Sequence, residues 1–220
     1  MKVLTLEFNG ISNIGLYGYL TKEYLLLGKE VSEKYDEQIE KALKVKVKRI
    51  TIAGTSLIGV FLNGDKEKIV VPDIIFEHEE QILKDLKIDY EKIETVNTCL
   101  GNNIVVGEDY FIVNNDFKEK EIKQLEKSLG KKGVVKEYAN VTAIGSLFVL
   151  NKNRGLVSNE LNEKELKEVE KILGKELTPG SMNMGSPYVK AGLLVNENGM
   201  IAGRDSGGPE ISNAEQALKE

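Results

Sequence analysis

Residues 143–157 read Ala-Ile-Gly-Ser-Leu-Phe-Val-Leu-Asn-Lys-Asn-Arg-Gly-Leu-Val, a glycine followed by two short apolar runs with a polar turn between them. The same order of features recurs along the chain, and the glycines that mark it are Gly15, Gly59, Gly101, Gly145 and Gly192. They lie 44, 42, 44 and 47 residues apart, and the chain of 220 residues is five times 44. Self-similarity at such a period predicts a repeat protein, in which no unit buries its apolar face alone.

Each repeat predicts the same local structure. Two β-branched or aromatic runs around Asn, Gly and Asp predict a β-hairpin. A helical pattern follows, as with Leu166, Val169 and Leu173, and Gly174 then predicts the end of the helix. A further extended run leads to the next glycine. We therefore expect a single domain, residues 1–220, whose five β-β-α-β units span residues 9–52, 53–96, 97–140, 141–183 and 184–220.

The two ends of the chain predict how the repeats close. Residues 1–8 form an extended run with no helix before it, and the fifth repeat stops after its helix with no strand to follow. The first strand is therefore expected to supply the missing strand of the fifth unit. A ring closed in this way has no orphan end repeat that needs a cap. The expected fold class is α/β with pseudo-fivefold symmetry, closed by the N-terminal strand.

The composition narrows the class of protein and of partner. The chain is 41% hydrophobic and 30% charged, with one cysteine, which is typical of a cytoplasmic globular protein. No apolar run reaches the length of a membrane span, and the N-terminus has no signal-peptide core. The net charge of −5 disfavours a broad phosphate-neutralising surface. Two kinds of partner stay open: a basic protein surface, and a few local RNA contacts.

Motifs for catalysis are incomplete. Residues 205–209, Asp-Ser-Gly-Gly-Pro, resemble the nucleophile segment of chymotrypsin-like proteases, but the single histidine, His78, lies in an acidic helical segment. A serine nucleophile needs a histidine base within hydrogen-bond reach, so we expect this string to be a turn before the last helix. Cys99 is expected to be a small buried residue beside a repeat glycine. Neither metal-ligand spacing nor a P-loop occurs, and we expect no catalytic residue, no metal and no cofactor.

Polar residues gather at the corners between repeats. Asparagine tolerates left-handed backbone and bonds to local backbone groups, so these positions also suit turns. Several such corners around a ring would form one flat, mostly uncharged face, which suits docking on a large partner better than holding a small substrate. The residues that we expect to make this contact, with the glycines that position them, are Asn13, Gly15, Asn63, Gly101, Asn102 and Asn103.

Several short sequence motifs resemble those of a known protein family, and they occur in the same order along the whole chain. Residues 99–102 read Cys-Leu-Gly-Asn, and residues 144–146 read Ile-Gly-Ser. Residues 180–186 read Gly-Ser-Met-Asn-Met-Gly-Ser, and Ala-Gly-Leu-Leu-Val-Asn follows at 191–196. These are similar to Ala-Leu-Gly-Asn, Val-Gly-Ser, Gly-Thr-Val-Asn-x-Gly-Ser and Ala-Gly-x-Val-Val-Asn of the translation initiation factor 6 family. The chain most resembles the archaeal members, which lack the long C-terminal tail of the eukaryotic ones.

The resemblance implies a pentein-type propeller of five subdomains. It implies a monomeric, cytoplasmic translation factor that binds the large ribosomal subunit near the sarcin–ricin loop, mainly through ribosomal proteins with minor rRNA contact. Such a factor prevents premature association with the small subunit and acts in large-subunit maturation. It uses no cofactor, small-molecule substrate or membrane. Asn102 ranks first among the contact residues because it lies in the best-matched motif.

Two alternatives from other classes stay open. Penteins include guanidine-modifying hydrolases and transferases, which use Cys, His and carboxylates in the axial channel. This chain offers only Cys99 in the third repeat and His78 on an outer helix for that chemistry. The other alternative is a ring-shaped scaffold with a different protein partner.

Overall fold

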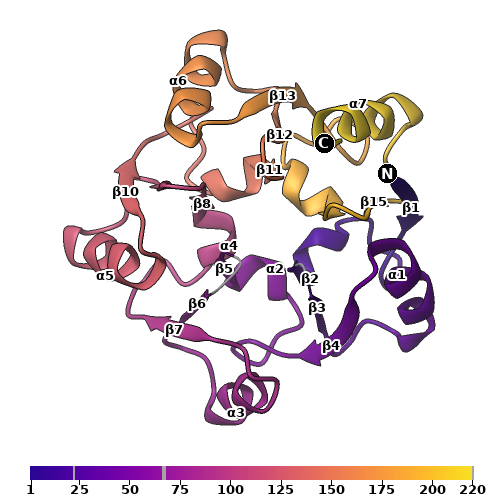
Figure 1. Ribbon diagram of the computed structural model, residues 1–220, viewed down its shortest axis with the longest axis horizontal. Coiled ribbons are helices and arrows are strands. Elements are labelled where there is room, and N and C mark those ends of the chain that lie inside the picture. The colour runs from indigo at the N-terminus through magenta and orange to yellow at the C-terminus, as the bar shows by residue number, and fades with distance from the viewer. Residues whose placement is uncertain (22, 66–67, 220) are drawn as a thin grey trace.

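Five three-stranded sheets surround one axis in the computed structural model, which describes residues 1–21, 23–65 and 68–219 (Figure 1). The inner strand of each sheet is antiparallel to the middle strand, and the outer strand is parallel to the middle strand. In the first four units a helix on the outside of the ring connects the middle strand to the outer one; in the fifth the helix follows the middle strand, and the outer strand comes from the N-terminal end of the chain. Each unit is thus a hairpin followed by a β-α-β crossover, as expected, and the fold class is α/β.

The helices and strands fall into five units. The first has β2 (Gly18–Leu20), β3 (Tyr24–Gly28), η2 (Glu33–Tyr35), α1 (Asp36–Leu43) and β4 (Lys46–Ile50); the second has β5 (Asn63–Gly64), β6 (Ile69–Pro72), α3 (Glu77–Asp85) and β7 (Tyr90–Ile93). The third has β8 (Ile104–Val106), β9 (Tyr110–Val113), α5 (Glu119–Leu129) and β10 (Lys132–Val135). The fourth has β11 (Phe148–Leu150), β12 (Arg154–Ser158), α6 (Glu163–Leu173) and β13 (Glu176–Gly180). The fifth has β14 (Leu193–Val195), β15 (Gly199–Gly203), α7 (Gly208–Leu218) and, from the other end of the chain, β1 (Lys2–Leu6).

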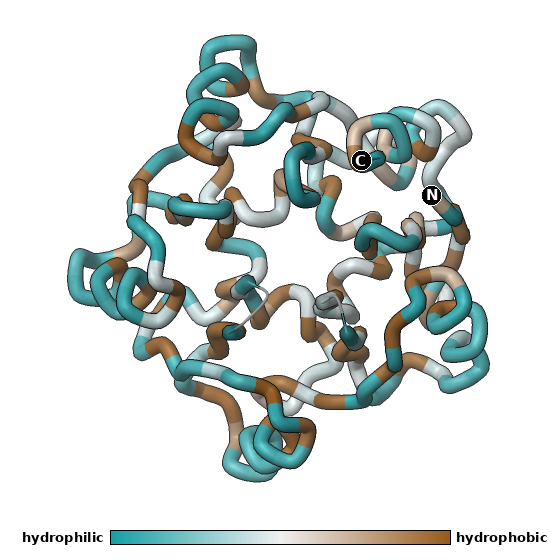
Figure 2. The backbone as a smooth tube through the Cα atoms, viewed as in Figure 1, coloured by the Kyte–Doolittle hydropathy of each residue, from teal (hydrophilic) through white to brown (hydrophobic). Residues whose placement is uncertain are grey.

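The outer helices show how local sequence sets the element bounds. At the start of α6, the Asn162 side chain accepts hydrogen bonds from the backbone of Lys164 and Glu165, each at 3.0 Å. At its end, Gly174 adopts φ 63°, the left-handed conformation that closes a helix. Val169 and Leu173 are buried against the sheet, as their spacing predicted. Figure 2 shows the result in every unit, with hydrophilic residues on the outside of the helices and apolar residues toward the sheets.

Short helical turns form a ring around the axis, one from each unit. They are η1 (Ile14–Leu16), α2 (Ile58–Phe61), α4 (Leu100–Asn103), η3 (Ile144–Leu147) and η4 (Val189–Gly192). A Cβ on Gly59 would overlap the carbonyl oxygen of Gly15, and one on Gly101 would overlap that of Gly59. A Cβ on Gly145 would lie 2.6 Å from the carbonyl oxygen of Ile104. The repeat glycines therefore let the backbones of neighbouring units touch.

The fifth position of this ring is Lys190, so the sequence alignment of Gly192 is wrong. The residue before η4, Tyr188, has φ −82° and ψ 68°, close to the −78° and 56° of Ala143 before η3. This makes Lys190 the counterpart of Gly145. The corner loop before η4 spans Met182 to Ser186, one residue longer than the corner from Tyr138 to Val141. Gly192 lies two residues further on, where a Cβ would meet the Met182 side chain.

The ring closes through β1, as the sequence predicted. This strand pairs in parallel with β15, from Lys2 opposite Gly199 to Leu6 opposite Gly203. Phe8, just after β1, is completely buried in a cluster with Ile14 of the first unit and Ile201 of the fifth. The unit boundaries proposed above stay a prediction.

Lys190 places a positive charge on the axis. Its ammonium donates a hydrogen bond to the carbonyl of Gly101, two units away across the ring. Desolvation by the surrounding protein lowers the pKa of Lys190 from 10.5 to about 8. Between pH 8 and pH 10.5 the unfolded chain keeps the Lys190 proton, whereas the native protein has lost it. The free energy of unfolding therefore rises with pH in this range. Below pH 8 the native protein bears the full free-energy cost of desolvating the Lys190 ammonium, at most on the order of 3 kcal/mol.

We expect Lys190→Met to stabilise the protein at pH 7 by about 1–2 kcal/mol, because it removes a desolvated charge and keeps the apolar stem. The gain should shrink as the pH rises through 8 and vanish near 10.5. Urea unfolding at pH 7, 9 and 10.5 measures this. A variant less stable than the wild type at pH 7 would show that the ammonium holds the ring together.

Deleting residues 1–8 should destabilise the whole ring, because it removes the outer strand of the fifth sheet and the buried side chains of Leu6 and Phe8. Burial of each is worth about 1.5–3 kcal/mol, so the loss is several kcal/mol. Circular dichroism during heating measures it, with Lys2→Thr, an exposed change in the same strand, as control. An unchanged unfolding temperature for the deletion would refute closure by this strand.

Candidate functional site

The ring has two unlike faces. The middle and outer strands of every unit end on one face, which we call the corner face. It consists of the segments that lead to the helical turns, 8–13, 52–57, 94–99, 138–143 and 182–188, and of the loops before the outer helices, 29–32, 73–76, 114–118, 159–162 and 204–207. The opposite face, the hairpin face, carries the turns between inner and middle strands and the C-terminal ends of the outer helices.

Exposed apolar side chains concentrate on the corner face. Among the described residues, six of the eight large hydrophobic side chains that are exposed lie there: Ile11, Ile74, Phe76, Val96, Met184 and Tyr188. A seventh, Val135, is the last residue of β10, an outer strand that ends toward this face. Val96 is 81% exposed and Met184 is 83% exposed. The eighth, Tyr110, lies at the start of β9 on the hairpin face. Because most of the exposed large apolar side chains lie on this face, the corner face is the candidate interaction surface.

Buried glutamates hold the corner loops in place. Glu79 accepts hydrogen bonds from the backbone of Ala53 at 2.8 Å, Gly54 at 2.9 Å and Phe76 at 3.0 Å. Burial acts to raise the pKa of Glu79, but hydrogen bonds from Thr51 and these amides outweigh it, so the pKa lies below its usual value. The carboxylate is therefore ionised at neutral pH.

Other units use the same device. Glu210 accepts from the backbone of Gly185 at 2.8 Å, and Glu165 accepts from Ala139 at 3.1 Å. Each of these glutamates belongs to the first turn of an outer helix, so the helix fixes the corner loop of its own unit. A loop held in this way loses little conformational entropy when it binds a partner.

The first turns of the outer helices are more acidic than their last turns. The first turns of the outer helices, on the corner face, contain Asp36, Glu37, Glu77, Glu79, Glu80, Glu119, Glu121, Glu163, Glu165 and Glu210. Their last turns, on the hairpin face, contain Lys41, Lys84, Lys127 and Lys171, each beside an acid of the same turn, Glu40, Asp85, Glu126 or Glu170. Both sets complement the helix dipole. The corner face thus surrounds its apolar side chains with negative charge, which is complementary to a basic protein and not to phosphate.

The contact residues expected from the sequence lie in different settings. Asn13 is exposed on the corner face and accepts a hydrogen bond from Asn183 at 2.9 Å. Asn102 and Asn103 are half-buried on α4, beside the axis. Asn63 is only 8% exposed, and its amide donates to the carbonyls of Leu100 at 3.2 Å and Ile104 at 2.6 Å.

Gly15 and Gly101 are buried in the ring of helical turns. The structure brings Asn63, Gly101, Asn102 and Asn103 together where the second and third units meet, whereas Asn13 lies at the junction of the fifth and first. Sequence reasoning missed the exposed apolar residues. Their signal was present, since residues such as Phe76, Val96 and Met184 interrupt turn segments without belonging to any periodic pattern.

A pocket of about 210 Å³ follows the axis inside the ring. Its lining comes from η1, η3 and η4 and from the inner strands of all five units, and consists of Gly15, Gly18, Tyr19, Leu20, Asn63, Gly64, Ile104, Val105, Val106, Gly145, Phe148, Val149, Leu150, Lys190, Leu193, Leu194 and Val195. Lys190 is the one charged residue in this described lining.

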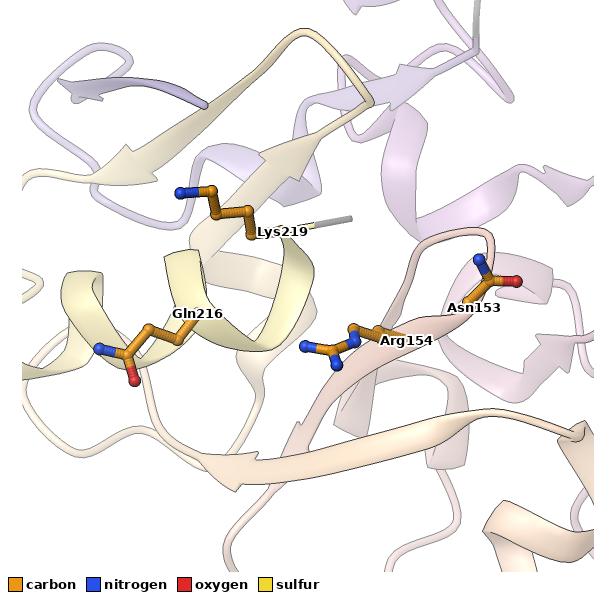
Figure 3. Close-up of a pocket in the computed structure, with 4 residues that line it drawn as sticks. All are labelled: Asn153, Arg154, Gln216 and Lys219. Atoms are coloured by element: carbon orange, nitrogen blue, oxygen red, sulfur yellow. The ribbon is translucent and has the colours of Figure 1, made fainter.

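A wider depression lies between β12 and α7 and is lined by Asn153, Arg154, Gln216 and Lys219. Figure 3 shows these side chains pointing in different directions, so they converge on no common ligand. Arg154 is also paired with Glu176 at 3.1 Å. The four described side chains therefore form no binding site in this depression.

The residues of the catalytic motifs stay apart. His78 lies on α3 at the outside of the ring, and Cys99 precedes α4 at the axis, where it is half-buried (Figure 1). Ser206 donates to the Asn183 side chain at 3.0 Å in the turn before α7, which is the structural role expected for that string. Across residues 1–21, 23–65 and 68–219, no group of His, Cys, Asp and Glu is placed to hold a metal ion. Within the same ranges no helix has the length and apolar character to cross a bilayer.

Comparison with known proteins agrees with this architecture. Among solved structures, the N-terminal domain of a cyanobacterial arginine dihydrolase superposes with a TM-score of 0.53 at 12% identity, over 86% of this chain and 71% of that one. A dimethylarginine dimethylaminohydrolase superposes with a TM-score of 0.55 at 10% identity, over 76% and 69%. At such low identity the two likenesses show the fold alone, which is the five-unit pentein fold.

Sequence comparison covers almost the whole chain. Translation initiation factor 6 of Pyrococcus furiosus is 38% identical over 227 residues, which is 99% of this chain and 99% of that protein. The protein of the same name from Thermococcus onnurineus is 31% identical over 227 residues, 99% of this chain and 98% of that protein. The model of the eIF-6 family matches residues 3–217. The chain therefore belongs to the eIF-6 family.

Proposed function

We propose that this protein is a translation factor that binds the large ribosomal subunit with its corner face and prevents premature association with the small subunit. The observation that carries the proposal is the gathering of exposed apolar side chains on one rigid, acid-rimmed face of the ring. Family membership and the names of the archaeal relatives support action in translation. A role in maturation of the large subunit belongs to the same proposal.

The mechanism needs binding energy and bulk, and no chemistry. A rigid ring that docks on the joining surface of one subunit excludes the other subunit sterically. Preformed corner loops, held by Glu79, Glu165 and Glu210, keep the entropic loss on docking small. The acidic rim attracts basic proteins and speeds their encounter. We therefore infer that ribosomal proteins make most of the contact, and rRNA little. The family resemblance implies that these are the proteins near the sarcin–ricin loop.

Within this face we assign two kinds of role. Phe76, Met184 and Tyr188 act as apolar anchors, since aromatic and similar large side chains carry most of the energy of typical interfaces. Asn13, Asn102 and Asn103 supply hydrogen bonds around them.

Asn63, Gly15 and Gly101 act indirectly. A buried amide and two glycines packed against neighbouring backbone hold the ring of turns in shape and present little side chain to a partner. The protein acts as a monomer, one copy on each subunit, in the cytoplasm.

The alternative of a guanidine-modifying enzyme is less well supported. A guanidinium entering the axial pocket would meet the like charge of Lys190, and His78 lies at the outside of the ring. A scaffold with another protein partner would use the same corner face. Co-sedimentation with purified large subunits separates that alternative from the proposed function.

We expect Phe76→Asp combined with Met184→Asp to weaken binding to large subunits at least tenfold, because both changes replace exposed apolar side chains of the proposed contact by charge. Sedimentation through sucrose measures binding, and the same gradients show whether joined ribosomes shift to free subunits. Tyr110→Asp is the matched control, an exposed aromatic on the hairpin face. Equal loss from the control, or none from the double variant, would contradict the choice of face.

The two faces should also respond differently to charge reversal. Glu77→Lys with Glu163→Lys, on the corner rim, should slow association with the subunit and weaken its dependence on salt. Lys84→Glu with Lys127→Glu, at the hairpin-side ends of α3 and α5, should leave association unchanged. Stopped-flow measurements at two salt concentrations test this. If the lysine changes abolish binding instead, the hairpin face contacts rRNA phosphates and the proposed orientation is wrong.

A further inference from the structure

The axial pocket combines features that point to a ligand of a particular charge. It has a volume of about 210 Å³, which is room for about seven water molecules at the density of the liquid. Much of its wall is hydrocarbon from the inner strands, including Leu20, Val106, Leu150 and Val195. A pocket with apolar walls and few polar groups is the usual form of a small-molecule site.

Lys190 gives this pocket its only charge among the described lining residues. Its ammonium has three donors, and the hydrogen bond to the Gly101 carbonyl uses one. Within the described part of the chain no carboxylate lies within ion-pair distance of it; Arg49, by contrast, is paired with Asp36 at 2.7 Å. The ammonium is thus a partly desolvated charge that has no counter-ion among the described residues.

The charge is confined to one unit. The four counterparts of Lys190 in the ring of turns are Gly15, Gly59, Gly101 and Gly145, which have no side chain. The fold therefore has no need of a cation here. Desolvation that lowers its pKa to about 8 still leaves the ammonium as the main form at pH 7.

The pocket wall selects among anions. Phosphate and other multiply charged anions need several donors, whereas the Asn63 amide is already bonded to two carbonyls. A single negative charge matches the single ammonium, and a hydrocarbon chain matches the wall. We propose that the axial pocket binds a small organic monocarboxylate, with its carboxylate on the Lys190 ammonium and its hydrocarbon part against the inner strands.

Binding of pentanoate to the full-length protein at pH 7 tests this proposal. Isothermal titration measures affinity, and shifts of the leucine and valine methyl signals locate the ligand. We expect saturable binding that is at least tenfold tighter than that of pentanamide, the uncharged analogue of the same shape, and of inorganic phosphate. Methyl groups of the pocket wall, such as those of Leu20 and Val106, should shift.

Two variants of pocket residues test whether the ligand binds at this site. Lys190→Met should reduce pentanoate binding to the level of pentanamide, while Lys164→Met, an exposed lysine on α6, should leave it unchanged. Val195→Trp fills the pocket and keeps the ammonium, so it should also abolish binding. Binding that survives both pocket variants would overturn the proposal. So would phosphate binding as tight as pentanoate binding, or the absence of saturable pentanoate binding up to about 10 mM.

Discussion

The contact of backbone with backbone around the axis is the constraint on which the rest of the structure depends. A Cβ on Gly59 or Gly101 would overlap a carbonyl oxygen of the preceding unit, so only glycine lets the helical turns approach this closely. That approach joins the inner ends of the units. The apolar clusters between units then become shared, as where Leu26 of the first unit packs with Ile58 and Val71 of the second. No unit completes a core of its own, and stability belongs to the closed ring.

Closure also produces two faces of opposite character. Every outer helix runs from the corner face to the hairpin face, so its dipole favours acids at the first and lysines at the second. The helix starts also supply the glutamates, such as Glu79 and Glu210, that bind the corner loops. A surface that is rigid, apolar at its exposed side chains and negative around them follows from this geometry. Docking on a large basic partner requires those properties, and catalysis does not.

The fold could be predicted from the sequence because each repeat is specified by local features, namely residue spacing and turn residues. The helix stop at Gly174, the hairpins and the closing strand β1 all follow from spacing and turn chemistry. The prediction for the fifth ring position was wrong because it chose Gly192 by residue type. One extra residue in the preceding corner loop places Lys190 in that position instead. The burial of Asn63 could not be foreseen, because its partners, the carbonyls of Leu100 and Ile104, belong to the next unit. The choice of contact residues stays a prediction.

The most direct measurement of the central claim is amide hydrogen exchange of the wild-type protein, free and bound to purified large ribosomal subunits. Exchange reports each loop separately, and binding slows it where the partner excludes water and holds the backbone. The account predicts slower exchange on binding in the corner segments 8–13, 52–57, 94–99 and 182–188, with the turns at 107–109, 151–153 and 196–198 unchanged. Protection confined to those hairpin turns, or no difference between the free and bound protein, would contradict it.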